Sequence, residues 1–435
     1  MDTIFALSSG LLPSGIAIVR LTGPCIKSIL RQFIGFIPEP RYMSLCTIRS
    51  SSAEILDKAL VVYFPAPKSF TGEDCAEFHL HGGKAVVARI LEELTAIPGF
   101  RLAEPGEFAR RAFAEGKLDL TEAEGLADII NAETESQRRL AVMGTSGALA
   151  TLYRNWRSSL IKARALIETE LDFSDEEDIS NFAHDRIWAD IICLRDDILQ
   201  HIHNGKRAEV MRDGLKIVIA GAPNSGKSSV MNRLAGRDVS IVTEEAGTTR
   251  DALEIRLIID TLPIFVIDTA GLRDTENHIE KIGIDVAIAR MKEADLIILL
   301  DDMHNPQIVD LPEISTTVWH IGNKLDLGRG DCNRWPLQFS VWTGEGWDGF
   351  IEKLTTFCHE KIVNIGDIVP ARRRQITLLE NGLSELNAAL ETDTSNPELR
   401  AEHLRYASNY LGRVTGDIDI EDLLDVIFSE FCIGK

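Results

Sequence analysis

The sequence of 435 residues has no apolar run longer than a strand, and its seven cysteines are scattered without any Cys-x-x-Cys spacing. A membrane-spanning helix needs about 20 consecutive apolar residues, and a disulfide framework or a zinc knuckle needs regularly spaced cysteines. The start, Met1-Asp2-Thr3, lacks the positive charge of a signal peptide. We therefore expect a cytoplasmic protein that makes no membrane contact and has neither structural disulfides nor a zinc site.

Basic residues are also scarce, because 46 Lys and Arg stand against 67 Asp and Glu, for a net charge of -21. A protein that coats nucleic acid without sequence preference needs a basic field over a whole face. Any RNA contact must therefore be local or shared with a partner. The hydrophobic content of 45% is sufficient for packed cores, and the length predicts roughly three domains.

The clearest motif that is present is Gly221-Ala-Pro-Asn-Ser-Gly-Lys-Ser228, which follows a short apolar run and precedes a helix-like segment. This pattern, G-x-x-x-x-G-K-S, is typical of a phosphate-binding loop, whose glycines let successive backbone N–H groups point at phosphate oxygens. We expect Lys227 to neutralise the outer phosphates and the Ser228 hydroxyl to bind Mg²⁺.

Three further motifs follow in the order of a guanine nucleotide switch. In the loop 247–251, Thr249 is suited to complete the Mg²⁺ coordination. Asp268-Thr-Ala-Gly271 follows an apolar strand, so we expect Asp268 to reach Mg²⁺ through water and the Gly271 N–H to sense the γ-phosphate. In Asn323-Lys-Leu-Asp326, the final carboxylate accepts two hydrogen bonds that guanine offers and adenine does not. The motifs together predict GTP binding.

The group that orients the attacking water is not obvious from the sequence. Ras-like switches place a glutamine after Asp-Thr-Ala-Gly, where this chain has Leu272. Arg250, Asp251 and Glu280 are the nearby candidates, although by pattern alone Glu280 is typical of a solvated helix glutamate. Asn224 either has no ligand role or turns its amide oxygen to a monovalent cation beside the phosphates, and the chemistry alone leaves both open.

The segments on either side of this module have different periodicities. The N-terminal segment alternates short apolar runs with Gly and Pro, which predicts an α+β domain. The two segments that bracket the module carry apolar residues at three- and four-residue steps, which predicts helices. The first of these helices is expected to open with a capping box of Thr121 and Glu124. The predicted fold is multidomain: an α+β domain at 1–117, an all-α helical domain at 118–212 and 363–435, and an α/β P-loop GTPase domain inserted into the helical domain at 213–362.

Over its whole length the chain resembles the MnmE (TrmE) family of tRNA modification GTPases. The most specific pieces are Asp2-Thr-Ile4, 69–74, His81-Gly-Gly83, 105–108, 117–120, 247–251 and Cys432-Ile-Gly-Lys435. The resemblance implies that the N-terminal domain binds 5-formyltetrahydrofolate or a related one-carbon tetrahydrofolate and forms a homodimer. It also implies a heterotetramer with the flavoprotein MnmG, which adds a carboxymethylaminomethyl or aminomethyl group to C5 of the wobble uridine of certain tRNAs while GTP is hydrolysed.

The resemblance also implies roles for individual positions. Glu280 matches the family's water-orienting glutamate, and Cys432 matches the cysteine needed for the tRNA reaction. Folate contacts fall on Arg20, Glu77, Lys117 and Lys435. The potassium site falls on Asn224, Thr243, Glu245 and Thr248. The predicted GTP-binding residues are Asn224, Ser225, Gly226, Lys227, Ser228, Ser229, Thr243, Thr248, Thr249, Asp268, Thr269, Ala270, Gly271, Asn323, Lys324, Asp326 and Ser340.

One departure from the pattern concerns the base. The Ser-Ala pair that supports guanine in many GTPases is Ser340-Val341 here. We expect binding to persist, because the serine and the backbone remain. The alternative function is a ribosome-assembly GTPase switch, which has the same loop and threonines but leaves the first 117 residues and the cysteine tail unexplained.

Overall fold

The computed structural model describes residues 2–172, 181–236, 254–259, 261–268, 288–307, 316–361, 368–418, 424, 427–429, 431 and 434. Contacts divide the chain into two compact units. The first unit contains residues 1–130, 142–194 and 381–435, and the second contains residues 131–141 and 195–380.

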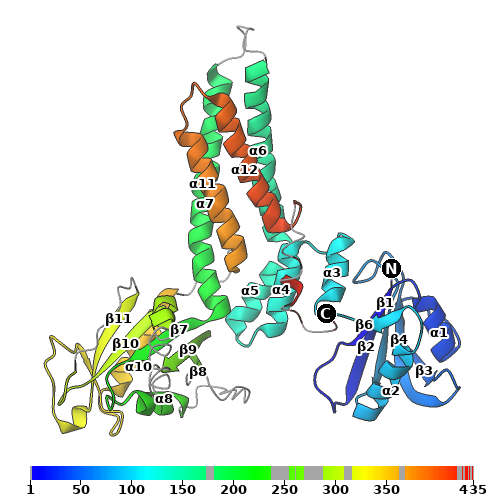
Figure 1. Cartoon of the computed structure of the whole chain (residues 1–435), viewed down its shortest axis with the longest axis horizontal. Helices are drawn as coiled ribbons and strands as arrows, with labels where there is room; N and C mark the ends of the chain where they lie inside the picture. Colours follow the sequence, from blue (N-terminus) through cyan, green and yellow to red (C-terminus); the bar gives the residue numbers. More distant parts are fainter. Residues whose placement is uncertain are drawn as a thin grey trace, which may run out of the picture. The chain divides into compact units, whose positions relative to one another are not determined.

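The first unit begins with a six-stranded sheet and two helices. Their bounds are β1 Thr3–Leu7, β2 Ile16–Thr22, α1 Ile26–Ile34, β3 Ser44–Arg49, β4 Ile55–Phe64, β5 Cys75–His81, α2 Lys84–Thr95 and β6 Phe100–Leu102. The strand order is β3-β4-β5-β2-β1-β6, and the pairing is antiparallel except between β1 and β6. Val19, Leu21 and Phe78 are fully buried between the sheet and the helices α1 and α2, so this core is that of the predicted α+β domain (Figure 1).

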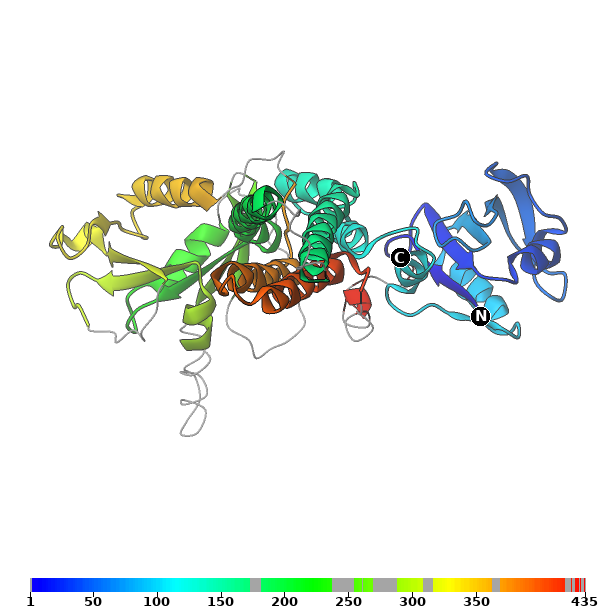
Figure 2. The ribbon, with the colours of Figure 1, turned by 90° about the horizontal axis from the view of Figure 1, so that it is seen from above.

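Long helices make up the rest of this unit. The helix bounds are α3 Glu107–Ala114, α4 Leu120–Asn131, α5 Glu135–Gly144, α6 Ala148–Asp172, α7 Asn181–Asp213, α11 Arg373–Glu391 and α12 Pro397–Thr415. Helices α5, α7 and α11 contribute residues to both units. Helices α6 and α12 pack side by side (Figure 1, Figure 2), and the Arg400 guanidinium lies 3.3 Å from the ring centroid of Trp188. This packing joins segments that are far apart in the sequence.

The cap of α4 differs from the predicted one. The Glu122 N–H donates to Asp119 Oδ1 at 3.0 Å, and the Asp119 N–H donates to Glu122 Oε2 at 2.9 Å. This is a reciprocal capping box, so the expectation of Thr121 and Glu124 was wrong. Because the helix begins at Leu120, Thr121 already lies in the first turn, where its hydroxyl donates to Asp119 at 2.6 Å.

The C-terminal residues that the structure describes pack back onto α3 and α4. Phe428 and Phe431 share a cluster of buried side chains with Ala109 and Leu120. At Gly106, where φ is +66°, a Cβ would lie 2.4 Å from the Phe428 carbonyl oxygen, so the close approach requires glycine. The end of the chain is thus anchored by packing and by a backbone contact.

The second unit contains a second six-stranded sheet. Its elements are β7 Leu215–Ala220, α8 Lys227–Ala235, β8 Glu254–Ile259, β9 Leu262–Asp268, β10 Leu296–Asp302, β11 Thr317–Asn323, η2 Leu325–Leu327, β12 Leu337–Gln338 and α10 Trp347–Lys361. The order is β12-β11-β10-β7-β9-β8, parallel throughout except that β8 runs antiparallel to β9. The predicted fold class is therefore confirmed.

Alternate residues of the central strand β7 face opposite sides of this sheet. Ile217 and Ile219 belong to the core that contains α8 and α10, whereas Val218 and Ala220 belong to a separate cluster. Because parallel strands end at the same edge, the carboxyl ends of β7, β9, β10 and β11 meet where α/β sheets bind ligands. Throughout the part of the chain that the structure describes, no helix has an apolar stretch able to cross a bilayer.

Candidate functional site

The predicted phosphate loop joins β7 to α8. Gly221 and Gly226 have φ values of +155° and +101°. A Cβ at Gly221 would lie 2.2 Å from the Leu300 carbonyl oxygen, and one at Gly226 would lie 2.2 Å from Asn323 Nδ2. Glycines therefore let the loop pack directly on β10 and β11. Gly226 also has no side chain with which to cap α8, which leaves the first N–H groups of that helix for an anion.

The Lys227 ammonium points back into this loop. Its Nζ donates to the carbonyl oxygens of Gly221 and Ala222, both at 2.9 Å, and the side chain is buried. The Ser228 hydroxyl donates to Asp268 Oδ2 at 3.4 Å. Two oxygen ligands thus meet at the end of β9, and oxygen is the ligand type that Mg²⁺ prefers.

Asn323 connects the phosphate loop to the loop expected to hold guanine. Its Nδ2 donates to the Ser225 carbonyl at 2.8 Å, and its Oδ1 accepts from the Val341 N–H at 3.3 Å. The Ser340 hydroxyl donates to Asp326 Oδ1, which holds the base-selecting carboxylate in place. The Ser225 hydroxyl is buried and has no hydrogen-bond partner among the described residues.

Lys324 is held by a carboxylate that the sequence motifs did not indicate. Its Nζ lies 2.6 Å from Asp302 Oδ2, and its φ is +69°. Burial raises the pKa of Asp302, but hydrogen bonds from Lys324 and from the His304 N–H outweigh burial, and the pKa lies below its usual value. Asp302 is therefore ionised at neutral pH and fixes the lysine.

These groups surround a cavity of about 580 Å³, within the range of about 300–1,000 Å³ typical of small-ligand sites. The cavity is lined by Pro223, Asn224, Gly226, Lys227, Ser228, Ser229, Asn323, Lys324, Asp326, Ser340, Val341 and Trp342. The structure thus brings together nine of the predicted GTP-binding residues. Trp342 was not among the predictions, although it lies only two residues beyond Ser340.

Ser225 and Asp268 are described but do not line the cavity, and the remaining predicted positions of this site and of the tail lie outside the described residues. They are Thr243, Glu245, Thr248, Thr249, Arg250, Asp251, Thr269, Ala270, Gly271, Leu272, Glu280, Cys432 and Lys435.

The predicted folate contacts Arg20 and Glu77 are neighbours on β2 and β5. Arg20 Nε donates to Glu77 Oε1 at 2.9 Å, and His79 Nε2 lies 3.3 Å from the other oxygen of that carboxylate. The Arg20 guanidinium also lies 5.6 Å from the ring centroid of Phe70 and 6.0 Å from that of Phe108. This half-buried pair of opposite charges beside aromatic rings suits a ligand that has carboxylates and a heteroaromatic ring.

Two further parts of the predicted folate site belong to the same unit. A Cβ on Gly72 would lie 3.2 Å from the Lys117 Cε, so that side chain runs along the 69–74 loop. At the chain end, the Gly434 carbonyl accepts a hydrogen bond from the Ser8 hydroxyl at 2.9 Å. Gly434 therefore lies beside the end of β1, next to the strand that carries Arg20.

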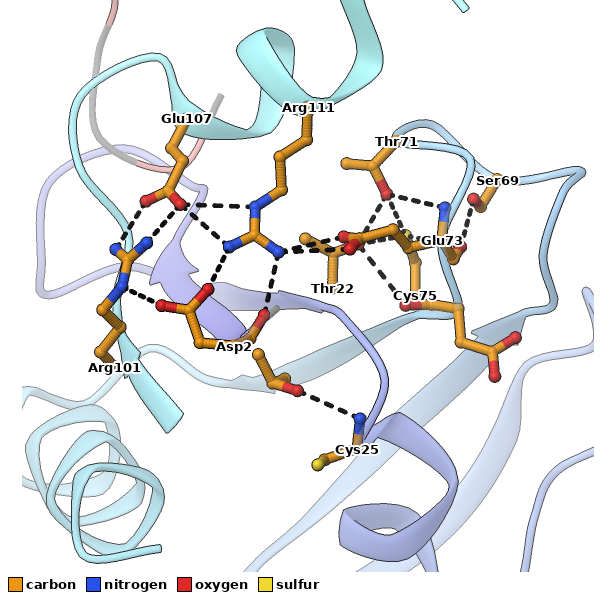
Figure 3. A network of polar contacts seen from close by, with 12 residues as sticks. Asp2, Thr22, Cys25, Ser69, Thr71, Glu73, Cys75, Arg101, Glu107 and Arg111 are labelled. Atoms are coloured by element: carbon orange, nitrogen blue, oxygen red, sulfur yellow. Dashed lines mark hydrogen bonds and ion pairs between the residues drawn. The ribbon is translucent and has the colours of Figure 1, made fainter. Parts of the chain in front are cut away.

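A polar network in the same unit joins the chain start, the 69–74 loop and α3 (Figure 3). Arg111 contacts Asp2 Oδ1 at 2.8 Å, Glu107 Oε1 at 3.0 Å and Glu73 Oε2 at 3.2 Å. Arg101 makes a second pair with Glu107 at 2.6 Å. Sequence patterns did not point to this network, because its members are spread over more than 100 residues.

Opposing effects act on the pKa of Glu107. Burial raises it, but hydrogen bonds from Arg101, the Glu104 N–H and Arg111 outweigh burial and leave the pKa below its usual value. The carboxylate is therefore ionised at neutral pH. It holds α3, and with it Phe108, in position beside Arg20.

Comparisons with known proteins cover the whole chain. A family model described as the MnmE helical domain matches residues 120–432, and one described as the GTP-binding protein TrmE N-terminus matches residues 3–117. The tRNA modification GTPase MnmE of Bartonella tribocorum is 61% identical over 435 residues, covering 100% of both chains. That of Brucella anthropi is 53% identical over 434 residues, covering 100% of this chain and 98% of its own.

Among solved structures, the G domain of the T. maritima FeoB iron transporter is 26% identical and covers 33% of this chain and 98% of its own. Its TM-score is 0.27, which is too low to support a conclusion about this chain.

Proposed function

This chain belongs to the MnmE family of tRNA modification GTPases, and from that premise we propose that it modifies the wobble uridine of certain tRNAs with the flavoprotein MnmG. The modification adds a carboxymethylaminomethyl or aminomethyl group at C5. A tetrahydrofolate supplies the one-carbon unit, and potassium-activated GTP hydrolysis drives the cycle. The protein acts in the cytoplasm as a homodimer, within a heterotetramer that includes MnmG.

One observation carries the nucleotide part of this proposal: Lys227 and Asp326 line a single cavity at the carboxyl edge of the parallel sheet. Lys227 and the first turn of α8 have the charge and the N–H donors to bind phosphates. Asp326, held by Ser340, accepts the two N–H groups that distinguish guanine from adenine. On binding, the Lys227 ammonium exchanges the carbonyls of Gly221 and Ala222 for phosphate oxygens.

Ser228 and Thr249 hold Mg²⁺ in this proposal, and Asp268 reaches it through water. The support is the 3.4 Å hydrogen bond that already brings the Ser228 hydroxyl to the Asp268 carboxylate. When bound, Mg²⁺ neutralises charge on the β- and γ-phosphate oxygens during phosphoryl transfer. This chain's own contribution is to hold two oxygen ligands at the end of β9, beside the first turn of α8.

Hydrolysis also requires a positioned water, and Leu272 has no group that orients one. Glu280 takes this role, with Arg250 and Asp251 as the alternative groups. Asn224 lines the cavity with φ at +65° and presents its amide oxygen to K⁺. The remaining potassium ligands are Thr243, Glu245 and Thr248. Potassium supplies positive charge where other GTPases use an arginine finger.

The folate binds in the first unit. Arg20 and Lys117 bind its carboxylates, and Glu77 accepts from N–H groups of the pterin. Lys435 adds a further cation, which is supported by the hydrogen bond that anchors the neighbouring Gly434 to Ser8. Cys432 takes part in the tRNA reaction.

Hydrolysis rates in potassium and in sodium test the cation part of the proposal. Wild type should be about 10-fold or more faster in potassium, and Asn224→Ala should lose that difference, because one source of oxygen ligation is removed. The exposed Asn333→Ala, elsewhere in the second unit, is the matched control and should keep the full potassium response. Equal rates for wild type and Asn224→Ala in both salts would exclude the potassium site.

A reconstituted reaction tests the tRNA chemistry. Protein, MnmG, tRNA, 5-formyltetrahydrofolate and GTP are combined, each is omitted in turn, and nucleosides of the tRNA are analysed. Modified uridine should appear only in the complete mixture. Unchanged modification without the folate would remove the one-carbon role from the first unit while leaving the GTPase intact.

A further inference from the structure

Trp342 differs from the other tryptophans of the chain in its exposure. Trp156, Trp188, Trp335 and Trp347 are buried, and Trp319 is partly buried. Trp342 is 90% exposed and lines the cavity that holds Asp326 and Lys227. A large indole left in water at the rim of a polar cavity gains free energy when a flat ligand covers it.

The backbone beside this indole is tightly held. The Val341 N–H donates to Asn323, and the Arg233 guanidinium donates to the Val341 carbonyl. On the other side, the Thr343 N–H donates to the Ser340 hydroxyl at 3.1 Å. The exposure of Trp342 is therefore a fixed feature of this loop, and only its side chain has room to move.

The hydrogen-bonding groups of the site meet only the edge of a guanine base. Asp326 takes the guanine N–H groups, and the Lys324 ammonium is already paired with Asp302 at 2.6 Å. Among the described residues that line the cavity, Trp342 has the only aromatic side chain, and aromatic rings stack on bases of every kind.

We propose that Trp342 stacks on the guanine ring of bound nucleotide and closes the base end of the cavity. The inference rests on the proposed placement of guanine at Asp326. It assigns two separable roles: the carboxylate selects guanine through the edge of the base, while the indole sets affinity through its face. Stacking on the ring face makes no hydrogen bond with the exocyclic amine of guanine. Trp342 therefore contributes equally to the affinity for guanosine and inosine nucleotides.

Binding of GDP and IDP to the full-length chain, measured by calorimetry, tests this division. Trp342→Ala should weaken both about 10-fold, because an aromatic stack on one base contributes about 1–3 kcal/mol, and the GDP-to-IDP preference should stay unchanged. Trp342→Phe keeps a ring and should bind within about threefold of wild type. Because the indole is exposed, its removal should leave the melting temperature unchanged.

Tryptophan emission gives a second, independent measurement. Addition of GDP should change the emission of wild type, and Trp342→Phe should lose that change although it still binds. Trp319→Phe is the matched control, because Trp319 packs on Phe357 and does not line the cavity. It should keep both the affinity and the emission change.

The possible failures are distinguishable. Wild-type GDP affinity in Trp342→Ala would overturn the stacking role. An emission change that depended on protein concentration would also overturn it, because the indole would then lie in a contact between two copies of the chain. Wild-type GDP affinity and preference in Asp326→Ala would instead overturn the placement of guanine.

Discussion

In the second unit, the buried Lys227 ammonium contacts two neutral carbonyl oxygens, those of Gly221 and Ala222. In the first unit, the Arg111 guanidinium contacts three carboxylates, those of Asp2, Glu73 and Glu107. Both cations are removed from water by their surroundings. They differ in the charge of the oxygen acceptors that remain without a partner when the cation is removed.

A carbonyl oxygen that loses Lys227 is neutral, so the loss of the ammonium leaves no charge behind. Without Arg111, Glu73 and Glu107 would each carry a charge with little access to water, which is costly, whereas Asp2 is 40% exposed. In the proposed function the lysine exchanges partners when phosphate binds, whereas the arginine keeps its three carboxylates. Lys227 is therefore suited to ligand binding, whereas Arg111 is suited to stabilising the fold of the first unit.

The largest effect is expected at the exchangeable cation. Lys227→Ala should lower GTP hydrolysis about 1,000-fold, or about 4 kcal/mol, because Lys324, the other lysine that lines the cavity, is already paired with Asp302 at 2.6 Å. The melting of the first unit should not change. Lys353→Ala, an exposed lysine of α10, is the control and should hydrolyse GTP at the wild-type rate. Comparable losses in both variants would show that the charge of Lys227 has no special role.

The opposite pattern is expected at the fixed cation. Arg111→Leu should destabilise the first unit by about 3 kcal/mol, because Glu73 and Glu107 are left without a partner they share. Chemical denaturation gives the loss of free energy, and hydrogen exchange locates it. GDP affinity should stay at the wild-type value.

The control for that variant is Arg138→Leu on α5, whose pair with Glu135 is exposed on both sides. It should leave the stability close to that of wild type, because exposed ion pairs contribute little. If the two variants lost equal stability, the network of Arg111 would be no more than a set of surface pairs.

Acid should destabilise the two units at different pH values. Burial lowers the pKa of His201, in the second unit, from 6.5 to about 4. Between these values the unfolded chain binds a proton that the folded chain does not, so stability falls as the pH falls, by about 2 kcal/mol from pH 6 to pH 4.5.

The Arg111 network of the first unit loses its stabilising effect at a lower pH. The pKa of Glu107 is lowered from 4.5 by its cationic partners despite burial, so its stabilisation is complete above pH 4.5 and is lost only as the pH falls further. Hydrogen exchange at pH 7, 5.5 and 4.5 should show protection lost first in the second unit, and His201→Leu should reduce that loss. Earlier loss in the first unit would reverse the assignment.

The nucleotide cavity could be predicted almost residue by residue from the chain. Gly221 to Ser228 are consecutive, and Asp268, Asn323 and Asp326 each follow an apolar strand, so parallel strands bring their ends to one edge whatever the details of packing. Asp302 and Trp342 were not predicted, because an aspartate after a strand and an exposed tryptophan become informative only when the neighbour or the cavity is known.

Local patterns along the chain were thus enough to predict the α/β nucleotide module, the flanking helices and the residues expected to contact phosphate and guanine, because those groups act through backbone and neighbours a few residues away. The tertiary structure alone decided which distant charges meet. Arg111 finds Asp2 and Glu73 because pairing of β1, β2 and β5 in one sheet places the chain start beside the 69–74 loop. The order of strands in a sheet depends on packing between remote segments, and no short motif encodes it.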